Sequence, residues 1–215
     1  AFGGEKLVTL GDGTFSGNLN AVGVPTAFSV VKTPQDNLQY STASYANRTG
    51  VAGPVGMWLR SFAGGDVTMS QTAAANPGSS YEFSAWSKWE SGYIGADPFS
   101  STQTTMSLEY LDGSDEVIGT PAVLDLRTVQ INDGTWRQLF LNGGIAPANA
   151  VSVKVSVAAI GMGNSGINPQ SAFFDDISLI ETPPGAASLA AVPEPSTLIL
   201  LGIALSMIGV GRRRN

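Results

Sequence analysis

Residues 151–160, VSVKVSVAAI, alternate apolar and polar side chains and constrain the fold more than any other part of the chain. Successive side chains of a β-strand point to opposite faces of a sheet. The alternation therefore places one set of residues on a buried face, namely Val151, Val153, Val155 and Val157. Serine and lysine take the other face, which predicts a half-buried strand here.

The rest of the chain up to Glu181 consists of short β-branched or aromatic runs separated by Gly, Pro, Asn and Asp, with no long stretch of helical period. The clearest predicted strands are Tyr81–Trp86, Thr104–Leu111, Gln138–Leu141, Val151–Ala159 and Phe173–Ile180. Weaker candidates are Ala27–Lys32, Val55–Phe62 and Asp66–Gln71. LEYLDGSDEVIG predicts a hairpin that turns around Asp112 and Gly113. This count and spacing favour an all-β fold with a single β-sandwich over a propeller.

Two missing residue types narrow the chemistry. The chain has no cysteine and no histidine, so disulfides, thiolate or imidazole metal ligands and a Ser-His-Asp triad are all excluded. Carboxylate pairs such as Glu109 with Asp112, or Asp115 with Glu116, stand beside the predicted turn and are typical of solvated charges. We therefore expect no enzymatic activity.

The charge is unevenly distributed along the chain. Three of the 11 basic residues are Arg212, Arg213 and Arg214, so residues 1–211 carry 8 basic and 17 acidic side chains, a net charge of −9. Such a domain repels phosphate backbones, which argues against a nucleic-acid partner and favours divalent cations.

The C-terminal part has a different composition. Residues 182–192, TPPGAASLAAV, form an uncharged Pro- and Ala-rich stretch that is typical of a flexible linker. An apolar run of 14 residues follows, from Leu198 to Gly211, and it predicts a short hydrophobic helix. This run is a marginal membrane span, and the arginines after it would stay cytoplasmic, leaving residues 1–195 outside. Hydropathy alone is equally consistent with a plain C-terminal membrane anchor.

The order of three motifs at the C-terminus indicates more than a membrane anchor. VPEPST, the apolar run and RRR together resemble the PEP-CTERM sorting signal. The resemblance implies that an exosortase recognises Pro193, Glu194 and Pro195 and processes the chain. It further implies export from a Gram-negative bacterium that makes exopolysaccharide or biofilm matrix, with transient anchoring in the inner membrane. Because the chain starts at Ala1, a secretory signal peptide is expected to have been removed. The expected organisation is a sandwich over residues 1–181, a linker over 182–192 and a sorting signal over 193–215.

Four phrases in the first 181 residues carry a second resemblance. GDGTFSG, PGSSYEFSAW, DGTWRQL and SAFFDDISLIE, in this order, resemble carbohydrate-binding jelly rolls of the galactose-binding-domain-like class. That resemblance implies a structural calcium ion held by Asp175, supported by Asp176 or Asp12. Calcium takes six to eight oxygen ligands, many of them carboxylates. Alternatively, Asp175 and Asp176 only cap backbone groups at a bend in the strand.

Aromatic side chains are the candidates for sugar contact. Trp86 alternates with Tyr81, Phe83 and Ala85 and is expected on the opposite face, with Trp89 and Tyr93 in the Gly-rich loop that follows. We expect Trp86, Trp89, Glu90 and Tyr93 to contact a ligand, with Lys88 beside them. The alternative is that these loop aromatics cover the edge of the core. Trp58 is a weaker candidate, and Trp136 is expected to be a buried structural residue.

Two functions fit these expectations. The first is an extracellular or cell-surface protein that binds extracellular polysaccharide without catalysis. The second is a structural matrix protein that self-assembles through its strand edges, without specific glycan binding.

Overall fold

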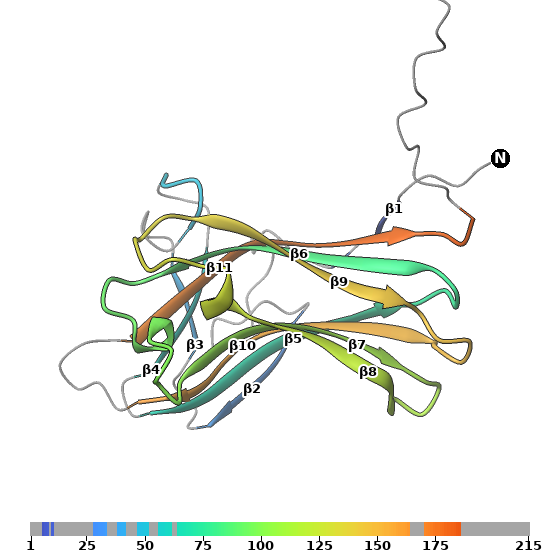
Figure 1. Cartoon of the computed structure of the whole chain (residues 1–215), viewed down its shortest axis with the longest axis horizontal. Coiled ribbons are helices and arrows are strands. Elements are labelled where there is room, and N and C mark those ends of the chain that lie inside the picture. The colour runs from blue at the N-terminus through green and yellow to red at the C-terminus, as the bar shows by residue number, and fades with distance from the viewer. Residues whose placement is uncertain are drawn as a thin grey trace, which may run out of the picture. The chain divides into compact units, whose positions relative to one another are not determined.

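The computed structural model describes residues 6–8, 10, 28–33, 38–41, 47–51, 56–61, 64–163 and 170–185. Over these residues the chain forms two antiparallel β-sheets that face each other (Figure 1). The six-stranded sheet runs in the order β3 (Leu38–Ser41), β4 (Gly56–Ser61), β11 (Gln170–Thr182), β6 (Ser80–Trp89) and β9 (Arg137–Ile145), with β1 (Lys6–Val8) also paired to β11. The five-stranded sheet runs in the order β2 (Ser29–Thr33), β5 (Gly65–Ala74), β10 (Ser152–Met162), β7 (Gln103–Leu111) and β8 (Val117–Asp125). Two short 3₁₀ helices, Ile94–Ala96 and Leu126–Thr128, complete the described elements. The predicted all-β sandwich is confirmed.

The core lies between the two sheets and follows from the period of two. Val153, Val155 and Val157 of β10 are at most 2% exposed and face similar residues of the six-stranded sheet, as their alternation predicts. Val151 is an exception, because β10 begins only at Ser152 and the Val151 side chain is 53% exposed. Its backbone is nevertheless bonded on both sides, to Leu111 and to Ala75.

The hairpin between β7 and β8 is also confirmed. Asp112 organises the turn, since its Oδ1 accepts hydrogen bonds from the N–H groups of Ser114 at 2.8 Å and Glu116 at 3.1 Å. Asp115 has a φ of 62°, a conformation that Asp tolerates better than most residues. Asp112 and Asp115 thus belong to the turn, where the sequence predicts solvated charges.

Each of the eight predicted strands has a counterpart in the structure, but some limits differ. Strand β6 continues to Trp89 instead of ending at Trp86. The short strands β1 and β3 were not predicted, because three or four residues are too few to show a period. Strand β11 is longer than predicted and contains a register shift between Asp175 and Ser178, where Asp176 adopts a φ of 46°.

A buried polar network holds the end of the last strand. Glu181 is 4% exposed, and its Oε1 accepts hydrogen bonds from Asn76 Nδ2 at 2.8 Å and from Ser79 Oγ at 2.7 Å. The Tyr81 hydroxyl accepts a further bond from the Asn76 N–H at 2.8 Å, and burial raises the pKa of Tyr81. The network joins the β5–β6 turn to the strand that precedes the predicted linker.

The compact unit that contains the sandwich spans Ala1–Pro184. Among the described residues, no helix is long and apolar enough to span a membrane. The predicted hydrophobic helix and most of the predicted linker lie outside the described residues.

Candidate functional site

The predicted aromatic ligand residues separate onto two faces of the six-stranded sheet. Trp86 lies on the face turned away from the core, opposite Tyr81, Phe83 and Ala85, as predicted. Trp89, three residues further along the same strand, points the other way and is 1% exposed. Trp89 is therefore not on the outward face beside Trp86, because β6 continues through it and its odd position turns the indole into the core, so it can reach a ligand only where it borders the pocket described below.

Tyr93 is also a core residue. It is 2% exposed, packs against Trp89 with ring centroids 5.7 Å apart, and shares a 2.7 Å hydrogen bond between its hydroxyl and that of Thr104. Burial raises the pKa of Tyr93 to about 12. A side chain at Gly95 would collide with the Tyr93 ring, so the 3₁₀ turn after it encloses the ring. Tyr93 thus covers the core edge, which is the alternative that the sequence left open.

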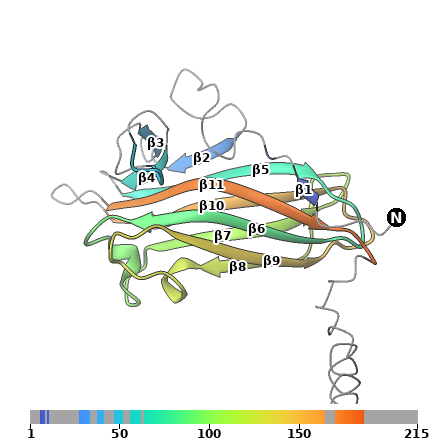
Figure 2. The same cartoon turned by 90° about the horizontal axis from the view of Figure 1, so that it is seen from above.

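A layer of aromatic side chains lies on the outward face around Phe173. We call Trp58, Trp86, Lys88, Trp136 and Phe173 the outer-face cluster. Phe173 of β11 is the register partner of Trp58 on β4 and of Lys88 on β6, so these three form one row across the sheet. Figure 2 shows the order of the four strands β4, β11, β6 and β9 that carry or border it. Although Phe173 faces away from the core, it is only 3% exposed.

The rings of Trp58 and Trp136 pack against Phe173, and cations lie against these rings and against Trp86. Trp58 stacks on Phe173 with centroids 5.9 Å apart, and Trp136 approaches Phe173 at 6.5 Å. Lys88 Nζ lies 5.0 Å from the Trp136 ring centre and 5.1 Å from that of Phe173. Burial lowers the pKa of Lys88 below its usual value. Arg60 lies over Trp58 at 4.4 Å and Arg48 over Trp86 at 4.8 Å, distances at which cation–π attraction is significant.

A shallow pocket of about 250 Å³ opens beside the cluster. It is lined by Lys88, Trp89, Glu90, Ser91, Gly134 and Phe173. Glu90 is half-buried, and its Oε2 has no hydrogen-bond partner among the described residues. An ammonium group, a carboxylate and a hydroxyl thus border an aromatic floor, an arrangement that suits a ligand with both hydrogen-bonding groups and an apolar face.

The sequence interpretation missed part of this cluster. Trp136 was expected in the core, but it precedes β9 and lies half-buried on the outward face. Phe173 was placed in a strand without a role. Alternation within SAFFDDIS already separates Phe173 from the core residue Phe174, but only strand pairing shows that Phe173 meets Trp58 and Lys88.

The structure describes two of the three predicted calcium ligands, Asp175 and Asp176. Asp175 is 4% exposed and accepts hydrogen bonds from the N–H groups of Arg48 and Asp176, both at 2.9 Å. Burial raises the pKa of Asp175, against the opposing effect of these hydrogen bonds. Asp176 is paired with the Arg48 guanidinium, while Asp12 lies outside the described residues.

These contacts do not by themselves make a calcium site. No group of three or more His, Cys, Asp or Glu side chains that could hold a metal occurs in the described part of the chain. Two carboxylates, one of them ion-paired, fall short of the six to eight oxygens that calcium takes. The described contacts of Asp175 and Asp176 hold a strand bend, and calcium binding stays a prediction because Asp12 lies outside the described residues.

Comparison with known protein families identifies the C-terminal segment. Residues 191–215 match the family model of the PEP-CTERM protein-sorting motif. The chain carries a PEP-CTERM sorting motif. The motif implies export, cell-surface sorting and processing by an exosortase, in agreement with the sequence interpretation. No curated protein sequence matches the chain significantly.

Solved structures show that the sandwich is a widespread fold. A cyclase from Fischerella sp. in its apo form is 12% identical, with 84% of this chain and 98% of that chain covered and a TM-score of 0.59. The enzymatically active domain of tailspike protein 4 from bacteriophage CBA120 is 13% identical, with a TM-score of 0.55. The similar region covers 80% of this chain but only 21% of the tailspike chain. TmCBM61, solved in complex with β-1,4-galactotriose, is 14% identical with a TM-score of 0.48, covering 72% of this chain and 88% of that chain.

These similarities concern the fold. The cyclase and the tailspike domain, both with TM-scores above 0.5, share the two-sheet sandwich with this chain. Two of the similar structures are described as a cyclase and as an enzymatically active domain, so this fold also occurs in enzymes.

Proposed function

We propose that this exported PEP-CTERM protein is a non-catalytic polysaccharide-binding protein of the surface or biofilm matrix of a Gram-negative bacterium. The glycan binds on the outer-face cluster and the pocket beside it. The position of the outer-face cluster supports this function, independently of the solved structures, whose sequences are only distantly similar.

The observation that carries the proposal is an aromatic layer where the core does not require one. Phe173, Trp58 and Trp136 pack together on the side of the sheet that faces away from the other sheet. Sugar rings have apolar C–H faces and hydroxyl edges, so they suit aromatic surfaces bordered by polar groups. Lys88 and Glu90 supply a donor and an acceptor at the border of this surface.

The test is binding of the full chain to a panel of soluble polysaccharides by affinity gel electrophoresis. The panel contains xylan, β-1,4-galactan, hydroxyethylcellulose, dextran and alginate. We expect retardation by at least one polymer, weakened about tenfold or more in Trp86→Ala and Trp136→Ala, because removal of a central aromatic contact costs about 2 kcal/mol.

Phe99→Ala is the matched control, since Phe99 is 96% exposed and lies in a loop outside the cluster. It should bind like the unaltered chain. The proposal is wrong if no polymer retards the chain, or if both tryptophan variants bind as tightly as the control.

We also propose that calcium binds when Asp12 and its neighbours join Asp175. Under this proposal the melting temperature of the full chain is higher in millimolar calcium than in EDTA, because a ligand that binds only the folded state stabilises it. The difference should disappear in Asp12→Ala. Equal melting temperatures in the two buffers would instead show that Asp175 and Asp176 act only through Arg48 and the backbone.

A further inference from the structure

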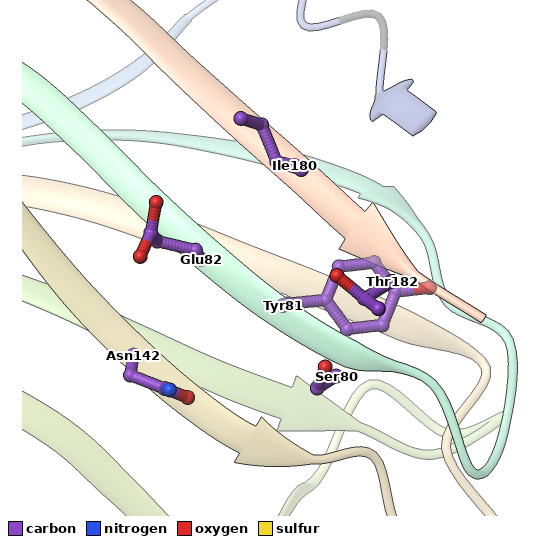
Figure 3. Close-up of a pocket in the computed structure, with 6 residues that line it drawn as sticks. All are labelled: Ser80, Tyr81, Glu82, Asn142, Ile180 and Thr182. Carbon is purple, nitrogen blue, oxygen red and sulfur yellow. The ribbon is translucent and has the colours of Figure 1, made fainter. Parts of the chain in front are cut away.

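A second pocket lies on the same outward face, near the other end of β6. It has a volume of about 220 Å³ and is lined by Ser80, Tyr81, Glu82, Asn142, Ile180 and Thr182. Figure 3 shows Glu82 and Asn142 on neighbouring strands, with Ile180 on the other side of Glu82 and with Ser80 and Thr182 closer to the strand ends. Glu82 is the register partner of both Asn142 and Ile180, so the three side chains form one row across β9, β6 and β11.

The groups in this pocket suit a hydroxyl-rich, uncharged ligand. Glu82 is exposed and supplies carboxylate oxygens that accept hydrogen bonds. Asn142 Oδ1 accepts a 2.8 Å bond from the Gly144 N–H, which leaves the Nδ2 group as the donor of this side chain. Ser80 and Thr182 add hydroxyl groups, and Ile180 offers a small apolar surface. The carboxylate would repel an acidic sugar, so a neutral sugar unit fits best.

This pocket and the outer-face cluster lie along one strand. Glu82 and Lys88 are both outward residues of β6, separated by six residue steps, which is about 20 Å of strand. The outward positions between them are Ser84 and Trp86. Ser84 is small and 6% exposed, and its register partner Phe140 on β9 presents a 53% exposed ring on the same face between the pocket and Trp86.

The size of the pocket indicates a subsite and not a complete binding site. Sites that enclose a whole small molecule usually measure about 300–1,000 Å³. At about 220 Å³ this one can hold one small unit of a longer ligand.

We propose that this pocket is a distal subsite of the glycan-binding face, which holds one neutral sugar unit of a polysaccharide lying lengthwise along β6. The inference rests on the proposed function. It adds that the protein binds internal stretches of an extended neutral polysaccharide and discriminates against short oligosaccharides and acidic polymers.

The experiment compares two-unit and six-unit oligosaccharides prepared from xylan, β-1,4-galactan, hydroxyethylcellulose and dextran, by calorimetric titration of the full chain. The six-unit ligand should bind at least tenfold more tightly, because only it reaches both the cluster and the pocket. The double variant Glu82→Ala with Asn142→Asp should lose about that factor for the six-unit ligand and none for the two-unit ligand. Asn142→Asp keeps the acceptor for Gly144, removes the Nδ2 donor and adds one negative charge, so the double variant has the same net charge as the unaltered chain.

Two further variants separate this inference from the proposed function. Trp86→Ala should weaken both lengths, whereas Thr72→Ala, an exposed position on the five-stranded sheet, should weaken neither. Equal affinity for the two lengths, an unaffected double variant, or binding to alginate alone would overturn the subsite while leaving glycan binding intact. Absence of binding to either length would overturn the proposed function and the subsite together.

Discussion

Trp89→Ala is expected to lower the free energy of unfolding of the sandwich by about 3–5 kcal/mol, the usual cost of deleting a large buried aromatic side chain. Trp89 is 1% exposed and contacts Tyr93 inside the core. The cavity left by the indole cannot collapse easily, because strand pairing to β11 holds the backbone of β6 in place. Urea denaturation of the full chain, followed by far-UV circular dichroism, measures the change.

Trp86→Ala provides the matched comparison, three residues away on the opposite face of the same strand. Its ring contacts Arg48 at 4.8 Å and lies outside the core, so we expect a loss of only about 1 kcal/mol. Trp89→Phe should also be mild, at about 1–2 kcal/mol, because Trp89 Nε1 has no hydrogen-bond partner among the described residues. If Trp86→Ala destabilises the chain as much as Trp89→Ala, the assignment of the two faces is wrong.

Glu181→Ala is the second substitution with a large expected effect, a loss of about 2 kcal/mol in the free energy of unfolding. Removal of the carboxylate leaves Ser79 Oγ, on a residue that is 0% exposed, without its acceptor, whereas Asn76 is exposed and its Nδ2 can bond to water. Each buried donor left unsatisfied costs about 1–3 kcal/mol. Thermal and urea unfolding of the full chain should both report the loss.

Two other glutamate variants define what this result means. Glu181→Gln retains an oxygen acceptor and should cost about 1 kcal/mol, since only the charge is lost. Glu116→Ala, an exposed residue of the β7–β8 turn whose described bonds use its backbone, should change stability by no more than about 0.5 kcal/mol. Hydrogen exchange should also increase at the end of β11 in Glu181→Ala. Unchanged exchange there would contradict the idea that this network holds the strand that leads to the sorting motif.

The candidate site shows how far local sequence patterns lead. The alternation of side chains in the predicted strand Tyr81–Trp86 correctly places Trp86 outward, but that strand ends before Trp89. The glycine between Trp89 and Tyr93 predicts a loop that contains both residues, and a loop has no period from which their orientation follows. Tertiary packing decided otherwise, since the strand gains core contacts by continuing to Trp89.

Features that depend only on neighbouring residues follow directly from the sequence. The alternation of valines in β10, the turn chemistry of Asp112 and the order of PEP motif, apolar run and arginines are all local patterns with direct physical or recognition consequences. Contacts between residues that are distant in the sequence depend instead on how the strands pair. Phe173 joins Trp58 and Lys88 because β11 lies between β4 and β6, and Glu82 joins Asn142 and Ile180 for the same kind of reason. Strand order and register arise from burial of the whole core, which no local run of residues encodes.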